Sequence, residues 1–357
     1  MSLPPTTKRR VAIALSGGID SSVAASLLID QGYEVIGLTA NLWQDESSSS
    51  AVEKTSRSSQ VAEFLGIPHI TIHLTDTFIR TIVNPFLTEY SKGRTPSPCI
   101  RCNQLIKFGL LLNHAVKMKC SHVAYGHYAR VEKQADQWHL LKGADARKDQ
   151  SYFLHRLNQK QLARTLFPLG SWRKNDVKMY IKTRGIPAQN NTESQDLCFT
   201  KNSDYAALLE KRFPELNKPG PIIDMQSRQL GCHHGFYHYT IGQREGLGIA
   251  SSARLYVTAI DAVSNTVTVG SRENTMSQSG IVDDVNWISA VPSDGMVCHT
   301  KLRYRHEGVI STLHFLSEGA IKVKFHTPQF AVTQGQAAVF YKGNDVIGGG
   351  WLRSAQP

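Results

Sequence analysis

Residues 11–22 read Val11-Ala12-Ile13-Ala14-Leu15-Ser16-Gly17-Gly18-Ile19-Asp20-Ser21-Ser22, and this stretch decides the fold. The apolar run Val11–Leu15 is short and continuous, which is typical of a strand buried inside a parallel sheet. Ile19, Val23 and Leu27 then recur at helical spacing, so we expect a helix to begin directly after the glycines. The stretch therefore predicts a strand, a tight Gly-rich turn and the first turn of a helix.

The turn between this strand and helix has the composition of a phosphate-binding loop. Gly17 and Gly18 let a polyphosphate approach the backbone, and the helix N-terminus offers amide donors and a favourable dipole. Ser16, Ser21 and Ser22 add hydroxyl donors. The lysine of a Gly-x-x-x-x-Gly-Lys-Ser/Thr loop is missing, which argues against hydrolysis of a γ-phosphate. A Gly-rich turn that only caps a helix is the alternative interpretation.

Strands and helices alternate in the first part of the chain. Further strands are predicted at 34–43, 70–74 and 122–125, further helices at 52–65 and 103–119, and a polar loop at 47–50. Such alternation indicates a Rossmann-like parallel sheet, hence the α/β class. We expect this layer to end at about residue 205.

The pattern changes in the remainder of the chain. One helix is predicted at 205–212, and short strands follow at 300–305, 308–316, 320–325 and 337–341 without any helical pattern between them. This arrangement indicates a small β-barrel. We therefore predict three domains, which are an N-terminal α/β domain at 1–205, a small mixed central domain at 206–280 and a C-terminal β-barrel at 281–357.

Length and charge limit the class of protein. The chain has 357 residues, a mean hydropathy of −0.27 and no apolar run near the roughly 18 residues that a membrane span needs. The N-terminus carries no stretch of signal-peptide type, so we expect a cytoplasmic protein without a membrane partner. Lys and Arg number 40 against 29 Asp and Glu, which favours polyanionic partners such as nucleic acid or nucleotides. Residues 91–107 hold Lys92, Arg94, Arg101 and Lys107 and no acidic residue.

Two cysteines form the second signal. Six cysteines are too few for a secreted disulfide scaffold, and only Cys99 and Cys102 are close neighbours. The prolines of Gly93–Asn103 forbid helix before Cys99, so both thiols should lie at a helix N-terminus. That position lowers the pKa of a thiol, and the charges of Arg101 and Lys107 act in the same direction. The segment therefore predicts reactive thiolates.

Cys198 is the candidate for a third sulfur. It lies in the polar loop 191–199, and a third thiol beside a Cys-x-x-Cys favours redox, sulfur-transfer or metal chemistry. Cys120, Cys232 and Cys298 stand singly, and we expect each of them to pack in the interior.

Further motifs occur along the whole chain. They are Pro96-x-Pro98-x-x-x-Cys102-Asn103, Ala124–Tyr128, Lys148–Phe153, Asp196–Phe199, Tyr239–Ile249, Arg303–Arg305 and Gly348–Trp351. Together with the Ser16–Ser22 loop, these motifs make the chain resemble the tRNA-specific 2-thiouridylase family of the PP-loop ATP pyrophosphatases. The resemblance covers essentially all of the sequence.

The resemblance implies a reaction and its participants. Family members replace O2 of the wobble uridine in tRNAs for Lys, Glu and Gln with sulfur, after ATP is split between its α- and β-phosphates and the oxygen has accepted AMP. ATP and Mg²⁺ are the implied cofactors. The implied partners are the anticodon stem-loop of tRNA and a sulfur donor, either a protein or sulfide. The 206–280 segment corresponds to a tRNA-binding adaptor domain.

The resemblance also assigns site residues. The ATP positions of the family fall on Ala14, Leu15, Ser16, Gly17, Gly18, Ile19, Asp20, Ser21, Ala40 and Gly126. The tRNA positions fall on Ser97, Pro98, Cys99, His127, Lys148, Asp149, Gln150, Arg303, Tyr304 and Gln336, and Lys148, Arg303 and Arg305 are candidates for contacts with the RNA backbone. The catalytic positions fall on Asp20, on Cys102 as the nucleophile and on Cys198 as the carrier of a persulfide.

Cys99 departs from the family, whose members have Asp at this position. Three cysteines, Cys99, Cys102 and Cys198, would suit a 4Fe–4S cluster with one open iron, and Cys102 and Cys198 would then be ligands. Zinc is the alternative metal, although a closed zinc site needs a fourth ligand that the sequence does not supply.

Other functions stay open. A PP-loop enzyme acting on another tRNA base, or an ammonia-dependent ligase, would share the Ser16–Ser22 loop. The chain has no N-terminal nucleophilic Cys and no glutaminase-like domain, and ammonia transfer does not need three cysteines. A noncatalytic RNA-binding module would explain the charge and the barrel, but it would not need the loop.

Overall fold

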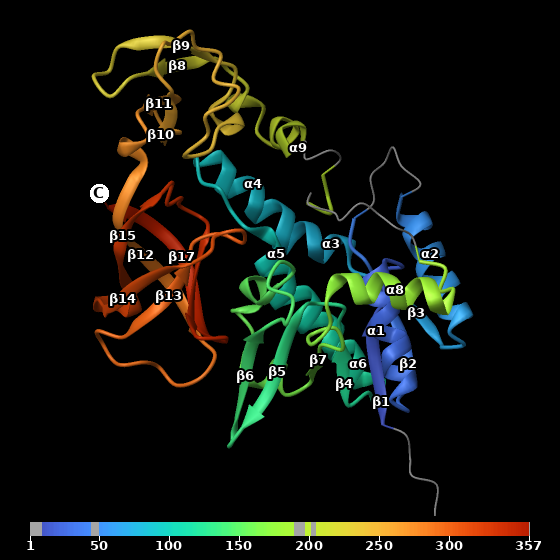
Figure 1. Ribbon diagram of the computed structural model, residues 1–357. Coiled ribbons are helices and arrows are strands. Elements are labelled where there is room, and N and C mark those ends of the chain that lie inside the picture. Colours follow the sequence, from blue (N-terminus) through green and yellow to red (C-terminus); the bar gives the residue numbers. More distant parts are fainter. Residues whose placement is uncertain (1–8, 44–49, 189–196, 201–204, 357) are drawn as a thin grey trace, which may run out of the picture. The chain divides into compact units, whose positions relative to one another are not determined.

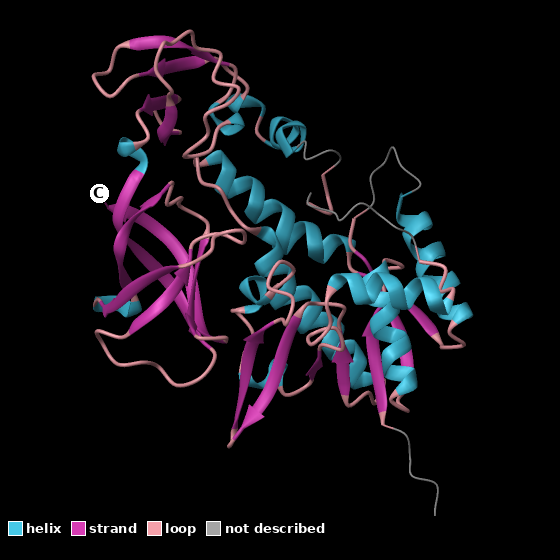
Figure 2. Cartoon of the chain, in the orientation of Figure 1, coloured by secondary structure: helices cyan, strands magenta, loops and turns pink. Residues whose placement is uncertain are grey.

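The computed structural model describes residues 9–43, 50–188, 197–200 and 205–356 (Figures 1 and 2). The chain forms two compact units. The first comprises residues 1–81, 99–199 and 344–347, and the second comprises residues 82–98, 200–343 and 348–357.

A parallel sheet forms the centre of the first unit. Its strand order is β3-β2-β1-β4-β7, and every pairing is parallel. The strands are β1 (Arg10–Ala14), β2 (Glu34–Asn41), β3 (His69–His73), β4 (His122–Ala124) and β7 (Thr165–Leu166). The α/β class and the first four strands are therefore confirmed, whereas β7 was not predicted, because two residues carry no periodicity.

The helices predicted after Gly18, at 52–65 and at 103–119 are present, and the first unit also contains short helices and helix α8 (Lys174–Arg184), which the sequence pattern did not indicate. The other helices of this unit are α1 (Ile19–Asp30), α2 (Ser50–Phe64), α3 (Thr75–Phe78), α5 (Pro98–Arg101), α6 (Leu112–Lys117) and α7 (Gln159–Leu162), with the 3₁₀ turn η3 (Ser151–Leu154). A π-helix, η2 (Cys102–Leu111), lies between α5 and α6. The predicted helix 103–119 thus lies mostly within one continuous helical run from Pro98 to Lys117, whose middle part is the π-helix η2. Of the predicted polar loop 47–50, residues 47–49 lie outside the described residues and Ser50 begins α2.

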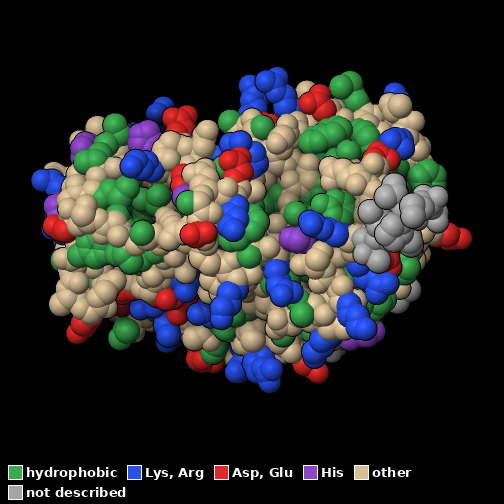
Figure 3. Space-filling view, turned by 90° about the horizontal axis from the view of Figure 1, so that it is seen from below, with side chains coloured by type: hydrophobic (Ala, Val, Ile, Leu, Met, Phe, Trp, Pro, Cys, Tyr) green, Lys and Arg blue, Asp and Glu red, His purple; other side chains and the backbone are tan. Residues whose placement is uncertain are grey.

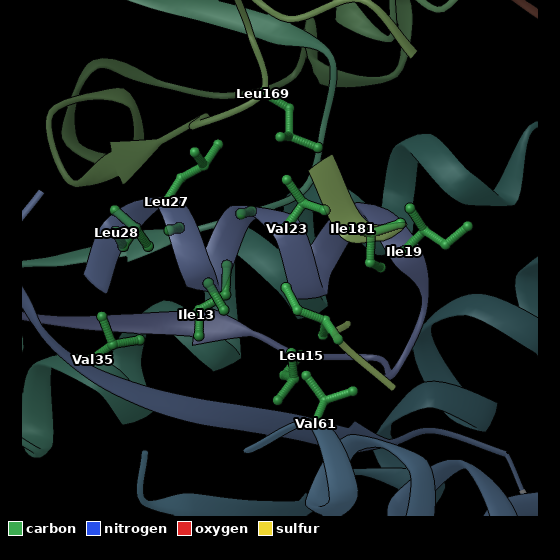
Figure 4. Close-up of a cluster of buried hydrophobic side chains, with 14 of the residues drawn as sticks. Ile13, Leu15, Ile19, Val23, Leu27, Leu28, Val35, Val61, Leu169 and Ile181 are labelled. Atoms are coloured by element: carbon green, nitrogen blue, oxygen red, sulfur yellow. The ribbon is translucent and has the colours of Figure 1, made fainter. Parts of the chain in front are cut away.

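The core of the first unit lies between β1 and the helices α1 and α8. Val11 and Ile13 of β1 and Val23 of α1 are completely buried there (Figure 4). Val177 and Ile181 of α8 complete the cluster. This packing holds the segment between β1 and α1, which contains the Gly-rich loop, at both of its ends.

A hairpin extends the first unit. Strands β5 (Ala129–Gln134) and β6 (Gln137–Lys142) pair in antiparallel fashion, and Asp345 and Val346 of β17 pair with Leu141 and Leu140 of β6. His139 Nδ1 lies 2.7 Å from Asp345 Oδ2. Residues 344–347 therefore belong to the first unit and extend this hairpin. The predicted domain boundaries 1–205, 206–280 and 281–357 stay a prediction.

The second unit contains two sheets. The smaller has the order β10-β11-β8-β9 and comprises β8 (Gly220–Ile223), β9 (Gln229–His233), β10 (Tyr256–Asp261) and β11 (Thr266–Gly270). The larger comprises β12 (Met276–Trp287), β13 (Val297–Lys301), β14 (Val309–Phe315), β15 (Ile321–Phe330), β16 (Ala337–Lys342) and β17 (Asp345–Gln356). Pairing of β12 with both β15 and β17 closes these strands into an antiparallel barrel, shown in orange and red in Figure 1. The predicted barrel is confirmed.

Two helices of the second unit pack through aromatic rings. They are α4 (Asn84–Ser91), which follows the π-helical turn η1 (Ile79–Val83), and α9 (Tyr205–Arg212), whose bounds are those predicted. The rings of Tyr90 and Tyr205 have centroids 4.4 Å apart. Short 3₁₀ turns complete the unit at η4 (Pro214–Leu216), η5 (Phe236–His238), η6 (Glu273–Thr275) and η7 (Ser317–Gly319). Among the helices of the described ranges, none is long and apolar enough to cross a membrane.

Truncating Ile13 tests the importance of the core beneath the loop. Ile13 is completely buried, so Ile13→Ala should lower the free energy of unfolding by about 2–5 kcal/mol through lost burial and a residual cavity. Met179 of α8 is 61% exposed, and Met179→Ala should change it by no more than about 0.5 kcal/mol. Urea titration followed by circular dichroism measures both. Equal effects would show that this cluster does not stabilise the unit.

Candidate functional site

The site lies where the strand order of the parallel sheet reverses. The chain proceeds from β1 to β2 and β3 on one side and then returns to place β4 on the other side of β1. Open parallel sheets bind ligands at the carboxyl ends of the strands at such a reversal. The loop after β1 and the residues Tyr125–His127 after β4 both lie at that edge.

Gly126 brings these two segments into direct backbone contact. A Cβ atom on Gly126 would lie 2.8 Å from the carbonyl carbon of Asp20 and 2.9 Å from the amide nitrogen of Ser21. Such distances are shorter than real side chains tolerate, so only glycine fits. Gly126 therefore lies against the first turn of α1, where the resemblance puts the nucleotide.

Hydrogen bonds within the loop fix its shape. Ser21 Oγ donates to Gly18 O at 3.0 Å and lies 3.1 Å from Ser16 Oγ, and Ser22 Oγ donates to Gly18 O at 2.9 Å. Gly17 has a φ of +73°, and a Cβ atom there would lie 2.8 Å from Arg57 Cβ. These contacts fix the backbone of the loop between Ser16 and Ser22.

Some residues of the loop are buried in the core, and others expose their side chains to solvent. Leu15 and Ile19 are buried in the hydrophobic cluster (Figure 4), so they can offer a ligand only their backbone. The side chain of Ser16 is exposed, and that of Asp20 is half-buried. Ala14 and Ala40 lie at the carboxyl ends of β1 and β2.

Thr39 connects the end of β2 to the loop. Its hydroxyl donates to Leu15 O at 2.6 Å and lies 2.7 Å from His69 Nε2, while Ser59 Oγ lies 3.1 Å from His69 Nδ1. Desolvation lowers the pKa of His69, so the ring is neutral near pH 7. A neutral ring with hydrogen bonds at both nitrogens supports the loop and does not act as a charge.

Asp20 has two partners that the sequence analysis did not identify. Lys174 Nζ lies 2.6 Å from Asp20 Oδ1, and the hydroxyl of Tyr128 donates to the same oxygen at 2.8 Å. Lys174 is 154 residues from Asp20 in the sequence, so no local pattern connects them. Tyr128 ends the Ala124–Tyr128 motif, which was the one available signal.

Cys99 and Cys102 lie where a helix begins, but their pKa values do not follow the prediction. Helix α5 starts at Pro98, in agreement with the expected N-terminal position. Desolvation nevertheless raises the pKa of Cys99, and it raises the pKa of Cys102 from 9.0 to about 12. The Lys107 ammonium lowers both values, but the effect of burial is larger. The expectation of low thiol pKa values is therefore wrong for this state of the protein.

Exposure differs between the two thiols. Cys102 is buried, at 7% exposure, whereas Cys99 is open to solvent although the protein surrounds its thiol closely. Both residues are protonated near neutral pH, since their pKa values lie above the ordinary value.

The π-helix η2 brings Lys107 toward Cys102. Residues five apart lie on different sides of an α-helix, but the wider turn of a π-helix places them on nearly the same side. The wide turn is held by side chains from elsewhere: the Tyr125 hydroxyl donates to Lys107 O, and Gln161 Nε2 donates to Phe108 O at 2.9 Å. The charge beside Cys102 is therefore a consequence of this irregular helix.

Cys198 is held by its neighbour Phe199. The Phe199 ring is buried, with centroids 5.8 Å from Phe78 and 6.1 Å from Trp43. Cys198 itself is exposed, and its charge raises the pKa of both Cys99 and Cys102. The three cysteines thus influence one another electrostatically.

The three predicted ligands Cys99, Cys102 and Cys198 do not surround the position of a single metal ion. Within residues 9–43, 50–188, 197–200 and 205–356, no group of three or more His, Cys, Asp or Glu side chains could hold a metal ion. The assignment of Cys99, Cys102 and Cys198 as ligands of a 4Fe–4S cluster stays a prediction. Of the other cysteines, Cys120 and Cys298 are buried as predicted, whereas Cys232 is exposed and the prediction for it is wrong.

Four of the predicted tRNA residues lie in the first unit beside the loop after β4. Asp149 is buried, and its carboxylate accepts hydrogen bonds from Gly143 N and from the amide and hydroxyl of Ser151. Gln150 Oε1 accepts from Tyr128 N at 3.1 Å. His127 is neutral, since burial lowers its pKa well below 6.5, and its buried Nδ1 has no hydrogen-bond partner among the described residues. Lys148 is half-buried.

The other predicted tRNA residues lie in the second unit, apart from Cys99. Gln336 Nε2 donates to Thr95 O at 2.8 Å, so it connects the barrel to the segment that precedes Ser97 and Pro98. Arg303 and Arg305 are exposed, and Tyr304 is half-buried. All of these RNA assignments stay predictions.

Charge is distributed rather than concentrated. Within the basic segment 91–107, Lys92 and Arg94 form ion pairs of 3.8 and 3.1 Å with Glu89, which lies just outside it. Lys and Arg side chains are spread over the face shown in Figure 3 and are interspersed with Asp and Glu. The local excess of positive charge is thus smaller than the sequence indicates.

Comparison with protein families defines the class. The tRNA methyl transferase HUP domain matches residues 9–202, the tRNA methyl transferase PRC-barrel domain matches residues 207–271, and the aminomethyltransferase β-barrel domain matches residues 277–352. The chain is therefore a HUP-type α/β protein with two additional domains.

Full-length relatives define the family. Two proteins described as tRNA-specific 2-thiouridylase MnmA, from Geobacter metallireducens and Symbiobacterium thermophilum, are each 41% identical to the chain. The first match covers 98% of this chain and 98% of that protein, and the second covers 97% and 93%. The chain belongs to the tRNA-specific 2-thiouridylase family.

A solved structure is only distantly similar. It is the U34-tRNA thiolase NcsA from Methanococcus maripaludis with its [4Fe-4S] cluster, at 20% identity and a TM-score of 0.37. The match covers 58% of this chain and 68% of that one. Similarity at this level says nothing about the site of the present chain.

The pKa of Cys102 predicts its reactivity. At pH 8, Cys102 should react with iodoacetamide on the order of a thousandfold more slowly than an ordinary thiol, because a pKa of about 12 instead of 9.0 leaves far less thiolate. Its rate should rise with each pH unit toward pH 12. Lys107→Met should slow it further, whereas Lys117→Met, which removes an exposed charge of α6, should not. Mass spectrometry of the alkylated peptide measures the rate, and a plateau between pH 8 and 9 would contradict the high pKa.

Proposed function

We propose that this protein performs the ATP-dependent 2-thiolation of the wobble uridine in tRNAs for Lys, Glu and Gln. Membership of the 2-thiouridylase family supports the proposal. The structural observation that supports it best is a phosphate-type loop at the carboxyl edge of the parallel sheet, in the same unit as three electrostatically coupled cysteines. Phosphate chemistry and sulfur chemistry are both needed for thiolation, and neither an RNA-binding module nor an ammonia-dependent ligase needs both.

The loop supports an adenylation step. O2 of the uridine attacks the α-phosphorus of ATP, which enters with Mg²⁺ as its substrate complex, and the bond from this phosphorus to the pyrophosphate oxygen breaks. The electron pair leaves with pyrophosphate, and the N3 proton of the base is lost. The amides at the start of α1 and the exposed Ser16 hydroxyl are suited to orient the phosphates. The oxygen that carries AMP can then leave, which a carbonyl oxygen cannot do.

Cys102 and Cys198 support the sulfur transfer. A donor of sulfane sulfur converts Cys198, whose residue is exposed, into a persulfide. The terminal sulfur bonds to C2 of the base, the C2–O bond breaks, and AMP leaves with its electron pair. The Cys102 thiolate attacks Sγ of Cys198, which breaks the sulfur–sulfur bond and leaves the electron pair on the transferred sulfur. The persulfide proton replaces the one lost from N3.

This sequence of steps leaves the two cysteines as a disulfide. A dithiol reductant must return them to thiols before the next persulfide forms, so each turnover consumes one sulfane sulfur and two electrons. Because Cys102 is buried and protonated in this state, its deprotonation must follow a change in its surroundings, and the nearby Lys107 charge favours the thiolate.

The thiol route differs from the cluster route in its metal requirement. Since the described cysteines do not form a metal site, we derive no step from a 4Fe–4S cluster. Anaerobic reconstitution with iron and sulfide, followed by absorption spectra, distinguishes the two routes. Thiolation that depends on reconstitution, and that is lost in Cys99→Ala, would replace the persulfide by the cluster.

An assay of thiolated tRNA tests the proposal. Protein, ATP, tRNA and a persulfide donor should yield 2-thiouridine and pyrophosphate, and Cys102→Ser and Cys198→Ser should each abolish the 2-thiouridine. The pyrophosphate of a first turnover should remain, because adenylation precedes sulfur transfer. Cys232→Ser is the matched control, since Cys232 is an exposed cysteine of the second unit. Pyrophosphate without 2-thiouridine in the unaltered protein would indicate another acceptor, and neither product would leave an RNA-binding module.

Salt dependence tests the RNA contacts. Arg303→Ala, Arg305→Ala and Lys148→Ala should each weaken tRNA binding and reduce the slope of log K against log salt by about 1, because each phosphate contact releases counterions. Arg353→Ala should leave the slope unchanged, since this arginine pairs with Asp283 at 3.4 Å. Unchanged slopes in all of the first three variants would place the RNA elsewhere, and the segment 91–107 would be examined next.

A further inference from the structure

The phosphate loop lacks a cation of its own. Ser16–Ser22 offers hydroxyls and backbone amides, and the N-terminus of α1 contributes about half a positive charge. A pyrophosphate that leaves the α-phosphorus carries several negative charges. A full positive charge near the loop would stabilise this leaving group far more than amides alone.

Lys174 is a cation that the fold brings to the first turn of α1. It is the first residue of α8 and is only 8% exposed, although a lysine is almost never buried without a partner. Its Nζ lies 2.6 Å from Asp20 Oδ1, at the first turn of α1, and 5.6 Å from the centroid of the Tyr128 ring. The ammonium therefore lies beside the first turn of α1, next to the phosphate loop, and forms an ion pair with Asp20 there.

The position of this ammonium is set by contacts on both sides of it. On the N-terminal side, the backbone N–H of Lys174 donates to Asp145 Oδ2 at 3.0 Å. On the C-terminal side, the Tyr180 hydroxyl donates to Asp30 Oδ2 at 2.7 Å and lies 3.0 Å from Ser26 Oγ. Helix α8 is thus attached along α1, and the Lys174 side chain has little freedom to leave the loop.

Because the Tyr128 hydroxyl also binds Asp20, Lys174 can exchange Asp20 for another anion without leaving the carboxylate unpaired. The Tyr128 hydroxyl donates to the same Asp20 oxygen as Lys174, and Gln150 Oε1 accepts a hydrogen bond from the backbone N–H of Tyr128. Asp20 therefore keeps one hydrogen-bond donor when the ammonium turns to another anion. The carboxylate side chain is 35% exposed, whereas that of Lys174 is 10% exposed, so the anionic partner faces the solvent from which a phosphate would arrive.

We propose that Lys174 is a catalytic residue that binds the pyrophosphate group of ATP and of the departing product. This inference rests on the proposed function. The Lys174 ammonium donates hydrogen bonds to the phosphate oxygens, while the bond between the α-phosphorus and the bridging oxygen breaks and its electron pair passes to pyrophosphate. The proposal explains how a loop without the usual lysine handles a triphosphate, since the lysine comes from α8 instead.

Binding of inorganic pyrophosphate to the full chain tests the assignment. Lys174→Met keeps the aliphatic stem and should weaken this binding about ten- to a hundredfold, as expected for a lost charge-assisted hydrogen bond. Lys174→Arg should retain most of the affinity. Lys178→Met removes an exposed lysine one turn along the same helix and should change the affinity by less than about twofold. Pyrophosphate affinity of Lys174→Met equal to that of the unaltered protein would overturn the proposal.

A second measurement uses the unaltered protein, so it stands even where Lys174→Met fails to fold. Inorganic pyrophosphate should slow the reductive methylation of Lys174 but not that of Lys178, as followed by mass spectrometry. Equal rates for Lys174 with and without pyrophosphate would overturn the proposal. Both measurements are independent of thiolation: a protein that forms no 2-thiouridine but protects Lys174 would contradict the proposed function alone.

Discussion

The site depends on a backbone contact that admits no side chain. At the reversal of the strand order, the residue after β4 lies against the first turn of α1, and a Cβ atom on Gly126 would be 2.8 Å from a backbone carbon of Asp20. This approach also places Tyr128, two residues further along, within 2.8 Å of the Asp20 carboxylate. At the carboxyl edge of the sheet, the backbone contact therefore fixes the position of the loop, and the Tyr128 and Asp20 side chains pack around it.

Burial and charge oppose each other at the cysteines. A helix start and a nearby ammonium both favour thiolates, but the cost of desolvation is larger and keeps Cys99 and Cys102 protonated. A protein that stores its sulfur chemistry in this form is protected from oxidation, because the thiolate is the species that oxidants attack. The π-helical turn keeps the Lys107 charge close to Cys102, where it favours the thiolate.

Local sequence patterns predict the α/β class, most strands of the parallel sheet and the bounds of α9. They do so because hydrophobic periodicity and the Gly and Pro residues that end helices and strands are features of a few neighbouring residues. Other features depend on residues far apart. The widened turn of η2 is held by Tyr125 and Gln161, and the Lys174–Asp20 pair spans 154 positions. The long barrel strands β12 and β17 were missed because Asp283, Asp284 and Gly348–Gly350 disrupt their alternation. The thiol pKa values were predicted with the wrong sign, since burial cannot be read from a Cys-x-x-Cys.

The short segment Asn344–Ile347, which belongs to the first unit, has a consequence for how the protein is made. Its residues Asp345 and Val346 supply the outer partner of β6, and His139 is paired with Asp345. During synthesis, β6 emerges roughly 200 residues before this partner, so its edge must wait unpaired until nearly the entire chain has left the ribosome. A fragment that ends after the α/β layer would keep that edge open permanently. The first unit is therefore not one contiguous stretch of chain, and the outer pairing of β6 forms only after Asp345 and Val346 have been synthesised.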